Sequence, residues 1–215
     1  MVRATYPRWG IGRRVWVLAG VFSACFLLTA QQPQPTTLPL NEQGKVVIAG
    51  RSMPYLIRHL PVNSFPELPA RIQDALNRRG CTIPQTYEAH GPENVVHGSL
   101  ERAGSSDWAV LCSAQGTVSL LVFFGERTEG AQPAVLASST ETERLQAQAH
   151  GATGVLGFDW GIDRATPEQI HEAQNGMVHP PARVDHDAVA EAMIDHPTTY
   201  HFYAKGAWSR LQMPD

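Results

Sequence analysis

A run of five apolar residues at positions 120–124 (Leu-Leu-Val-Phe-Phe) constrains the fold of this chain more than any other segment. A strand that is apolar on both faces must be covered on both sides, which places it in the centre of a sheet. Strand patterns cover residues 95–101, 108–113 and 117–125, and residues 114–116 predict a hairpin turn between the last two. The middle of the chain is therefore expected to form an antiparallel sheet.

Three segments have helical patterns. In the first, residues 69–79, a proline stands at the start and Gly80 follows as a stop signal. The second begins near Thr166, which is followed by a proline and, three positions on, by Gln169, as in a capping box. The third covers residues 185–194, where apolar residues share one stripe and two aspartates stand in the first turn, which favours negative charge.

Shorter strands are expected at residues 46–48 and 133–138, and a terminal hairpin at residues 198–204 and 207–211 around a Lys-Gly turn. Together these elements predict an α+β fold, a mainly antiparallel sheet with about three helices. The length of the folded part, residues 46–215, is typical of a single domain.

Residues 1–30 have the sequence pattern of a signal peptide or membrane anchor. Four arginines precede residues 15–30, which carry no charge, and a polar stretch follows. Three outcomes remain open: cleavage after Ala30, retention as a membrane anchor, and lipidation at Cys25. Each of them predicts an exported protein that is periplasmic, secreted or membrane-anchored. Residues 31–45 are polar and rich in proline, so we expect a disordered tether there.

The charge balance disfavours nucleic acid as a partner. The whole chain has a formal net charge of −3, and removal of the four N-terminal arginines leaves a mature part near −7. That part contains no cluster of lysine and arginine, whereas phosphate binding needs concentrated positive charge. For the same reason, contact with a membrane is expected only through the N-terminal segment, if it is not cleaved.

Two cysteines remain after the N-terminal segment, Cys81 and Cys112. An even pair in an exported domain is typical of a disulfide. The enclosed loop has about 30 residues, for which the chain-entropy model gives a stabilisation of roughly 3–4 kcal/mol. The alternative is a catalytic thiol at Cys112, but the strand-like sequence around it has no nucleophile signature. We therefore predict that the two cysteines are bonded.

Histidines and aspartates gather near the C-terminus, where a carboxylate could orient a metal-bound imidazole. The spacings, however, match no known metal motif such as H-E-x-x-H. We therefore favour ordinary surface histidines and charge pairing at a helix end as the explanation of this pattern. A metal site in this region would use His179, Asp185, His186, Asp187 and His196.

Residues 98–110 resemble the calcium-loop repeats of β-propellers only in part. Of the carboxylates that would hold calcium, Glu101 and Asp107 alone are present. The segment also occurs once, whereas a propeller needs several copies. We therefore expect a tight polar turn between two strands, capped by Asp107.

Other candidate motifs have structural interpretations. Glu141 and Glu143 lie in a polar run and are expected to be solvated. The glycines at 151–157 lack the G-x-G-x-x-G spacing, so a bend between strands is expected there. Trp160 and Trp208 are expected to pack in the core or against a hairpin rather than to form a platform for sugars. The chain contains no P-loop and no G-x-S-x-G nucleophile elbow.

Three passages together resemble a group of bacterial exported proteins with no known activity. They are residues 80–85 (Gly-Cys-Thr-Ile-Pro-Gln), residues 107–113 (Asp-Trp-Ala-Val-Leu-Cys-Ser), and residues 185–187 (Asp-His-Asp) followed by the hairpin with Trp208. The resemblance spans residues 46–215 and includes both cysteine positions. It implies a bacterial envelope or secreted protein, and it transfers no catalytic residue.

These observations favour a non-enzymatic exported domain that binds a partner, either another envelope protein or a small ligand. No cofactor is expected. The alternative from a different class is a metal-dependent hydrolase that uses the C-terminal cluster of aspartates and histidines. A carbohydrate-binding module that uses Trp160 or Trp208 is a third hypothesis.

Overall fold

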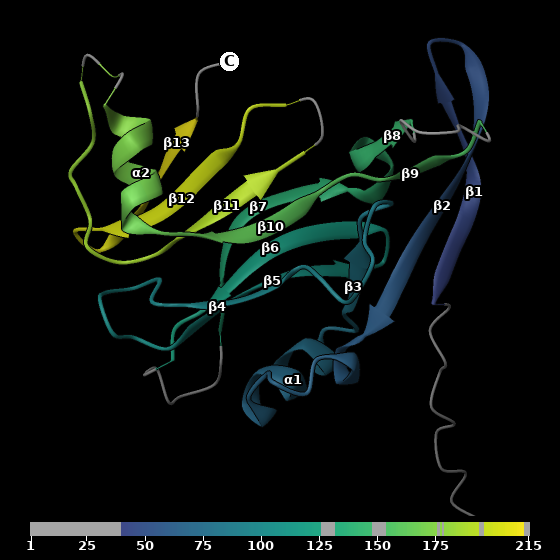
Figure 1. The fold of residues 1–215 in the computed structure, drawn as a ribbon. Coiled ribbons are helices and arrows are strands. Elements are labelled where there is room, and N and C mark those ends of the chain that lie inside the picture. Colours follow the sequence, from purple (N-terminus) through teal and green to yellow (C-terminus); the bar gives the residue numbers. More distant parts are fainter. Residues whose placement is uncertain are drawn as a thin grey trace, which may run out of the picture. The chain divides into compact units, whose positions relative to one another are not determined.

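Two β-sheets lie face to face, and each is covered on its other side by one α-helix (Figure 1). The computed structural model describes residues 40–125, 132–147, 154–175, 177, 179–193 and 196–212. The predicted signal or anchor, including Cys25, lies outside the described residues, and so does most of the predicted tether. Residues 38–215 form one compact unit.

In the described part of the chain the larger sheet has nine strands, and its strand pairs are antiparallel except for the pair of β2 with β9. Its order is β7 (Ala134–Thr140), β6 (Thr117–Phe123), β5 (Asp107–Ala114), β3 (Thr82–Gln85), β2 (Arg51–Pro61), β9 (Leu156–Phe158) and β8 (Leu145–Ala147), while β1 (Asn41–Ile48) pairs with β2 and β4 (Val95–Gly98) pairs with β5. The smaller sheet has the order β10 (Gly161–Ala165), β11 (Ala188–Ala192), β12 (Thr199–Ala204) and β13 (Ala207–Gln212). The predicted antiparallel sheet is confirmed.

Strands β5 and β6 are buried on both faces. Along β5, Ala109 and Leu111 face the smaller sheet, whereas Val110 and Cys112 face helix α1 (Ala70–Arg78). β6 lies between β5 and β7, as predicted for a central strand. Because side chains alternate across a strand, the continuous apolar run of β6 contributes side chains to both layers of the core.

Local sequence signals set the hairpin turns. Gln115 and Gly116 have φ angles of 53° and 75°, and Lys205 and Gly206 have φ angles of 53° and 83°. A type I′ turn needs positive φ at both central residues, and it matches the right-handed twist of the flanking strands. Both predicted hairpins, β5–β6 and β12–β13, are therefore confirmed.

Two of the predicted helices are also confirmed. Helix α1 is followed by Gly80, whose φ of 71° suits the residue that ends a helix. Helix α2 (Pro167–Gln174) begins with a capping box: the backbone N–H of Thr166 donates to Gln169 Oε1 at 2.8 Å, and the backbone N–H of Gln169 donates to Thr166 Oγ1 at 3.4 Å. Two short 3₁₀ turns, η1 (Val62–Ser64) and η2 (Glu141–Arg144), complete the helical segments of the described residues.

The predicted third helix, over residues 185–194, is wrong, because its centre forms strand β11. This strand pairs with both β10 and β12. Val189 faces the larger sheet, whereas Ala188 and Ala190 face α2. A short apolar segment that is buried on both faces also fits a helical stripe, so periodicity alone does not distinguish the two structures. The described residues therefore contain two α-helices rather than about three.

The boundary predicted for the tether also differs from the structure. β1 begins at Asn41, so residues 41–45 belong to a strand and not to a disordered segment. The reason is that β2 is long enough to pair with all of β1, from Asn41 opposite Arg58 to Ile48 opposite Arg51. The polar composition of residues 41–45, taken alone, gives no indication that β2 is available for pairing.

Cys81 and Cys112 form a disulfide, as predicted, with their Cα atoms 5.1 Å apart. Cys81 follows α1 and Cys112 lies in β5, so the bond joins the end of the helix to the central sheet. Disulfides persist in oxidising compartments, and the bond fits an exported protein. No helix among the described residues is long and apolar enough to cross a membrane.

Replacement of both cysteines, Cys81→Ala and Cys112→Ala together, is expected to lower the free energy of unfolding by about 3–4 kcal/mol, because the bond closes a loop of 31 residues in the unfolded chain. Urea denaturation of the oxidised protein and of the double variant measures the difference. Reduced wild-type protein is the control, and it should unfold like the double variant. Equal midpoints for the oxidised protein and the variant would contradict this role of the disulfide.

Candidate functional site

The residues proposed as metal ligands do not form one site. His186 Nδ1 is 3.0 Å from the carbonyl oxygen of Asp187, and the Asp187 carboxylate accepts the backbone N–H of Ser99 at 2.9 Å. His179 and His196 are exposed, as is Asp185. In the part of the chain that the structure describes, no three His, Cys, Asp or Glu side chains come together as a metal ion requires.

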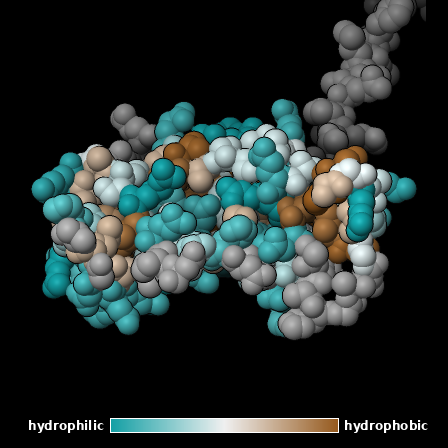
Figure 2. Space-filling view, turned by 90° about the horizontal axis from the view of Figure 1, so that it is seen from above, coloured by the Kyte–Doolittle hydropathy of each residue, from teal (hydrophilic) through white to brown (hydrophobic). Residues whose placement is uncertain are grey.

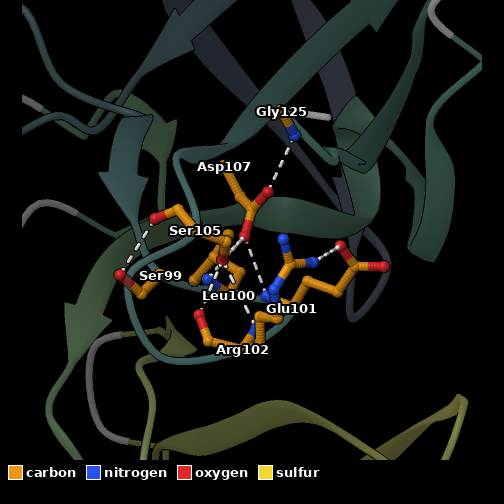
Figure 3. A network of polar contacts seen from close by, with 7 residues as sticks. All are labelled: Ser99, Leu100, Glu101, Arg102, Ser105, Asp107 and Gly125. Carbon is orange, nitrogen blue, oxygen red and sulfur yellow. Dashed lines mark hydrogen bonds and ion pairs between the residues drawn. The ribbon is translucent and has the colours of Figure 1, made fainter. Parts of the chain in front are cut away.

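Asp107 caps the polar turn between β4 and β5, as predicted (Figure 3). It is fully buried, and its Oδ2 accepts the backbone N–H groups of Leu100 and Glu101 and the hydroxyl of Ser105. Its Oδ1 accepts the backbone N–H of Gly125 at 2.8 Å. Four donors satisfy this carboxylate, so it serves the turn rather than a calcium ion.

The two tryptophans proposed as sugar platforms pack against the protein. Trp160 is fully buried in the core between the sheets. Trp208 is partly buried and stacks on Phe124 with ring centroids 5.8 Å apart, while Tyr203 meets it edge-on at 5.4 Å. Both tryptophans thus lie where the sequence predicted them, in the core and against a hairpin.

A buried polar cluster contains a residue that was predicted from the sequence to be solvated. Glu141, at the start of η2, is 1% exposed, so the prediction that it is solvated is wrong. Its Oε1 lies 2.8 Å from Nε2 of the buried His59 in β2, and it also accepts the hydroxyl of Ser113 in β5. Glu143, in contrast, is exposed and completes the capping box of Thr140. Three elements thus direct polar groups at one buried carboxylate.

A second carboxyl group, that of Glu42 in β1, completes the cluster. Glu42 Oε1 accepts the hydroxyl of Tyr55 at 2.8 Å, and the carboxyl group contacts Glu141. Burial and the neighbouring Glu141 raise the pKa of Glu42. Burial also raises the pKa of Glu141, but hydrogen bonds from His59, Ser113 and Glu42 outweigh it and hold this pKa below its usual value. The hydrogen bond to Glu42 and burial raise the pKa of Tyr55 to about 12.

The pKa of Glu42 is thus raised and that of Glu141 lowered, so a proton is more favourable on Glu42 than on Glu141. The buried Oε2 of Glu141 has no other hydrogen-bond donor among the described residues, so it is the oxygen that a protonated Glu42 can satisfy. A protonated Glu42 would link Tyr55 to Glu141 in one chain of hydrogen bonds that ends at His59 and Ser113. We name these five residues the carboxyl cluster.

A cavity of about 170 Å³ lies beside the carboxyl cluster, with Glu42, His59, Thr82 and Ser113 in its wall. Its size suits a few water molecules or a very small ligand. The order of the groups differs from a Ser–His–acid triad, because Ser113 donates to Glu141 and has no hydrogen bond to His59 within the described structure. The arrangement can hold and exchange a proton, but no imidazole stands between Ser113 and the carboxylate of Glu141.

The sequence contains signals for only some features of this cluster. Tyr55, Ile57 and His59 alternate along β2 and share its inner face, which a strand assignment for residues 51–61 would have indicated. Thr140 and Glu143 have capping-box spacing, which fixes where η2 begins. The contact of His59 with Glu141 joins residues 82 positions apart, and no local pattern predicts it.

Comparisons with protein-family models, curated proteins and solved structures give no match to this chain. The resemblance to bacterial exported proteins is therefore still a prediction.

The variant Glu42→Gln is expected to remove a pH dependence of stability. The pKa of Glu42 is raised in the folded protein, so the stability it contributes is complete below its unfolded value near 4.5 and is lost as the pH rises through the folded pKa. Glutamine stays neutral and can still donate to Glu141 and accept from Tyr55. The variant should therefore be as stable as the wild type in acid and more stable at alkaline pH.

Urea midpoints from about pH 4 to about pH 9 measure this difference. Glu67→Gln is the matched control, because Glu67 is an exposed carboxyl group outside the cluster and its removal should leave the pH profile unchanged. Parallel profiles for Glu42→Gln and the wild type would contradict a raised pKa of Glu42 in the folded protein.

Proposed function

We propose that the protein is a non-enzymatic binding domain of the bacterial envelope, periplasmic or secreted, and that it binds an extended segment of another envelope protein along β1. The observation that carries this proposal is the exposure of apolar side chains on the β1–β2 hairpin, at a strand edge without a neighbour in the described structure. The disulfide is compatible with export, because such bonds persist outside the cytoplasm.

The apolar surface of the hairpin lies on both of its strands. Val47 is 70% exposed, Ile48 43% and Leu56 39%. Figure 2 shows hydrophobic residues gathered at the right-hand end of the molecule, where Figure 1 has the β1–β2 hairpin. Among the described residues, β1 forms its strand ladder with β2 alone. Such an edge supports addition of a strand, in which main-chain hydrogen bonds give affinity and side-chain contacts give specificity.

The charges of the hairpin define the chemistry of the partner. Lys45, Arg51 and Arg58 are exposed, whereas Glu42, the one acidic residue of β1 and β2, faces the carboxyl cluster. An extended segment that alternates apolar and acidic residues would match both the apolar and the basic side chains. Such a segment is the occupant that we propose.

The two alternative functions considered from the sequence, a metal-dependent hydrolase and a sugar-binding module, have less support. A metal-dependent hydrolase would need the C-terminal histidines and aspartates in one place, and His186 and Asp187 are engaged with the protein instead. A sugar-binding face would need an exposed tryptophan, whereas Trp160 is buried and Trp208 stacks on its neighbours. In the carboxyl cluster Ser113 donates to Glu141 and not to an imidazole, so these residues do not form a Ser–His–acid triad.

Photo-crosslinking in the native host tests this function. A benzophenone amino acid placed at Val47 is expected to yield one crosslinked envelope protein, and the crosslinked peptide should alternate apolar and acidic residues. Val47 is largely exposed, so its replacement should change stability by less than about 0.5 kcal/mol. In the same background, Lys45→Glu with Arg51→Glu should abolish the adduct, because both changes place negative charge opposite the acidic segment.

The control position is Val135 in β7, which is 58% exposed and also lies in a strand at the edge of the larger sheet. No adduct is expected there. Adducts at both positions would indicate unspecific contact, a product of twice the mass would indicate a second copy of this chain, and an absence of adducts at Val47 would disprove binding at this edge.

A further inference from the structure

The guanidinium group of Arg144, the last residue of η2, has few hydrogen-bond acceptors around it. Its Nη1 donates to the thioether sulfur of Met193 at 2.7 Å, and its Nη2 is 3.8 Å from Glu191 Oε1. Its Nε is buried and has no acceptor in the described structure. A thioether is a weak acceptor, and 3.8 Å is too long for a hydrogen bond, so the guanidinium group has an ion pair with Glu191 but few hydrogen-bond acceptors for its five N–H groups.

The surroundings hold this guanidinium group in place. Its carbon atom lies 4.1 Å from the ring centroid of Trp160, which is itself fully buried. Stacking on an indole ring fixes the plane of an arginine and is favourable for the cation. Glu191 does not approach more closely, because its Oε2 accepts a hydrogen bond from His201 Nε2 at 2.7 Å. Arg144 is therefore held in orientation, and its ion pair with Glu191 does not include a hydrogen bond.

A cavity of about 200 Å³ opens beside Arg144. Its wall contains further hydrogen-bonding groups from β12, β13 and the segment before β12. They are those of His196, Thr199 and Gln212. The cavity thus combines one fixed cation with the carboxyl group of Glu191 and several hydrogen-bonding groups, in a volume that suits a small molecule or the end of a peptide.

We propose that this cavity binds a monocarboxylate, whose two oxygens replace the sulfur of Met193 as acceptors for the terminal nitrogens of Arg144. A planar carboxylate matches the planar guanidinium fork, and the paired charge-assisted hydrogen bonds are strong. A phosphate dianion fits less well, because Glu191 would stand within a few ångströms of its second charge. The carboxylate belongs either to a small acid or to the C-terminus of a polypeptide, which share this chemistry.

Binding of sodium propionate to the full chain tests the proposal, measured by tryptophan fluorescence and calorimetry at constant ionic strength. The emission should change because Trp160 stacks on Arg144. Inorganic phosphate should bind at least about tenfold more weakly than propionate. Acetyl-triglycine with a free carboxylate, compared with its amide, distinguishes the polypeptide source: tighter binding than propionate, lost in the amide, indicates a chain terminus.

Arg144→Lys is expected to weaken propionate binding at least about tenfold, because lysine offers a point charge instead of a fork. Arg164→Lys is the matched control: Arg164 also stands 3.8 Å from a carboxylate, that of Asp187, but does not line this cavity. Glu191→Gln should strengthen binding about threefold or more, since it removes a negative charge and keeps an acceptor for His201. This second variant tests the site even where Arg144→Lys does not fold.

Three results would overturn the proposal. The first is a lack of saturation at about 100 mM propionate. The second is an equal loss of affinity in Arg144→Lys and Arg164→Lys, which would indicate a general charge effect. The third is phosphate binding as tight as that of propionate, which would assign the cavity to another class of anion.

Discussion

Strands β5 and β6 carry apolar side chains on both faces, so neither face can be left in contact with water. Burial of one Leu, Val or Phe side chain contributes roughly 1.5–3 kcal/mol, and Leu111, Leu120 and Val122 are among those that the smaller sheet covers. Helix α1 covers the opposite face, and the disulfide ties its end to β5. Polar groups are consequently placed where strands end, and there Asp107 and Glu141 each collect several donors.

The sequence predicted those elements whose signals are local. The turns at Lys205 and Gln115 and the capping box at Thr166 depend on residues within four positions of one another, so they could be identified without knowledge of the fold. The segment around Val189 could not, because small apolar residues buried on both faces satisfy a helical and an extended pattern equally. Its partners in β10 and β12 decide the structure, and they are tertiary information.

The candidate site depended even more on distant contacts. A glutamate in a polar run is usually solvated, and Glu141 departs from this rule only because His59 and Ser113, far away in the chain, supply donors to a buried carboxylate. Arg144 shows the same difficulty, since its stacking on Trp160 and its distance from Glu191 arise from the packing of the two sheets. Residue type and spacing therefore identify candidates, whereas burial and the supply of partners determine which of them are unusual.

Strand β1 separates two environments that place opposite demands on charge. Its inner face puts Glu42 beside a second carboxyl group, which together with burial raises the pKa of Glu42, while its outer side exposes Val47 next to basic residues. An exposed apolar edge invites pairing with any strand, including that of a second copy. Lys45 and Arg51 oppose such self-pairing, because like charges would meet, and they favour an acidic strand instead. The apolar side chains would contribute affinity to either partner, so the discrimination between them comes from the charges.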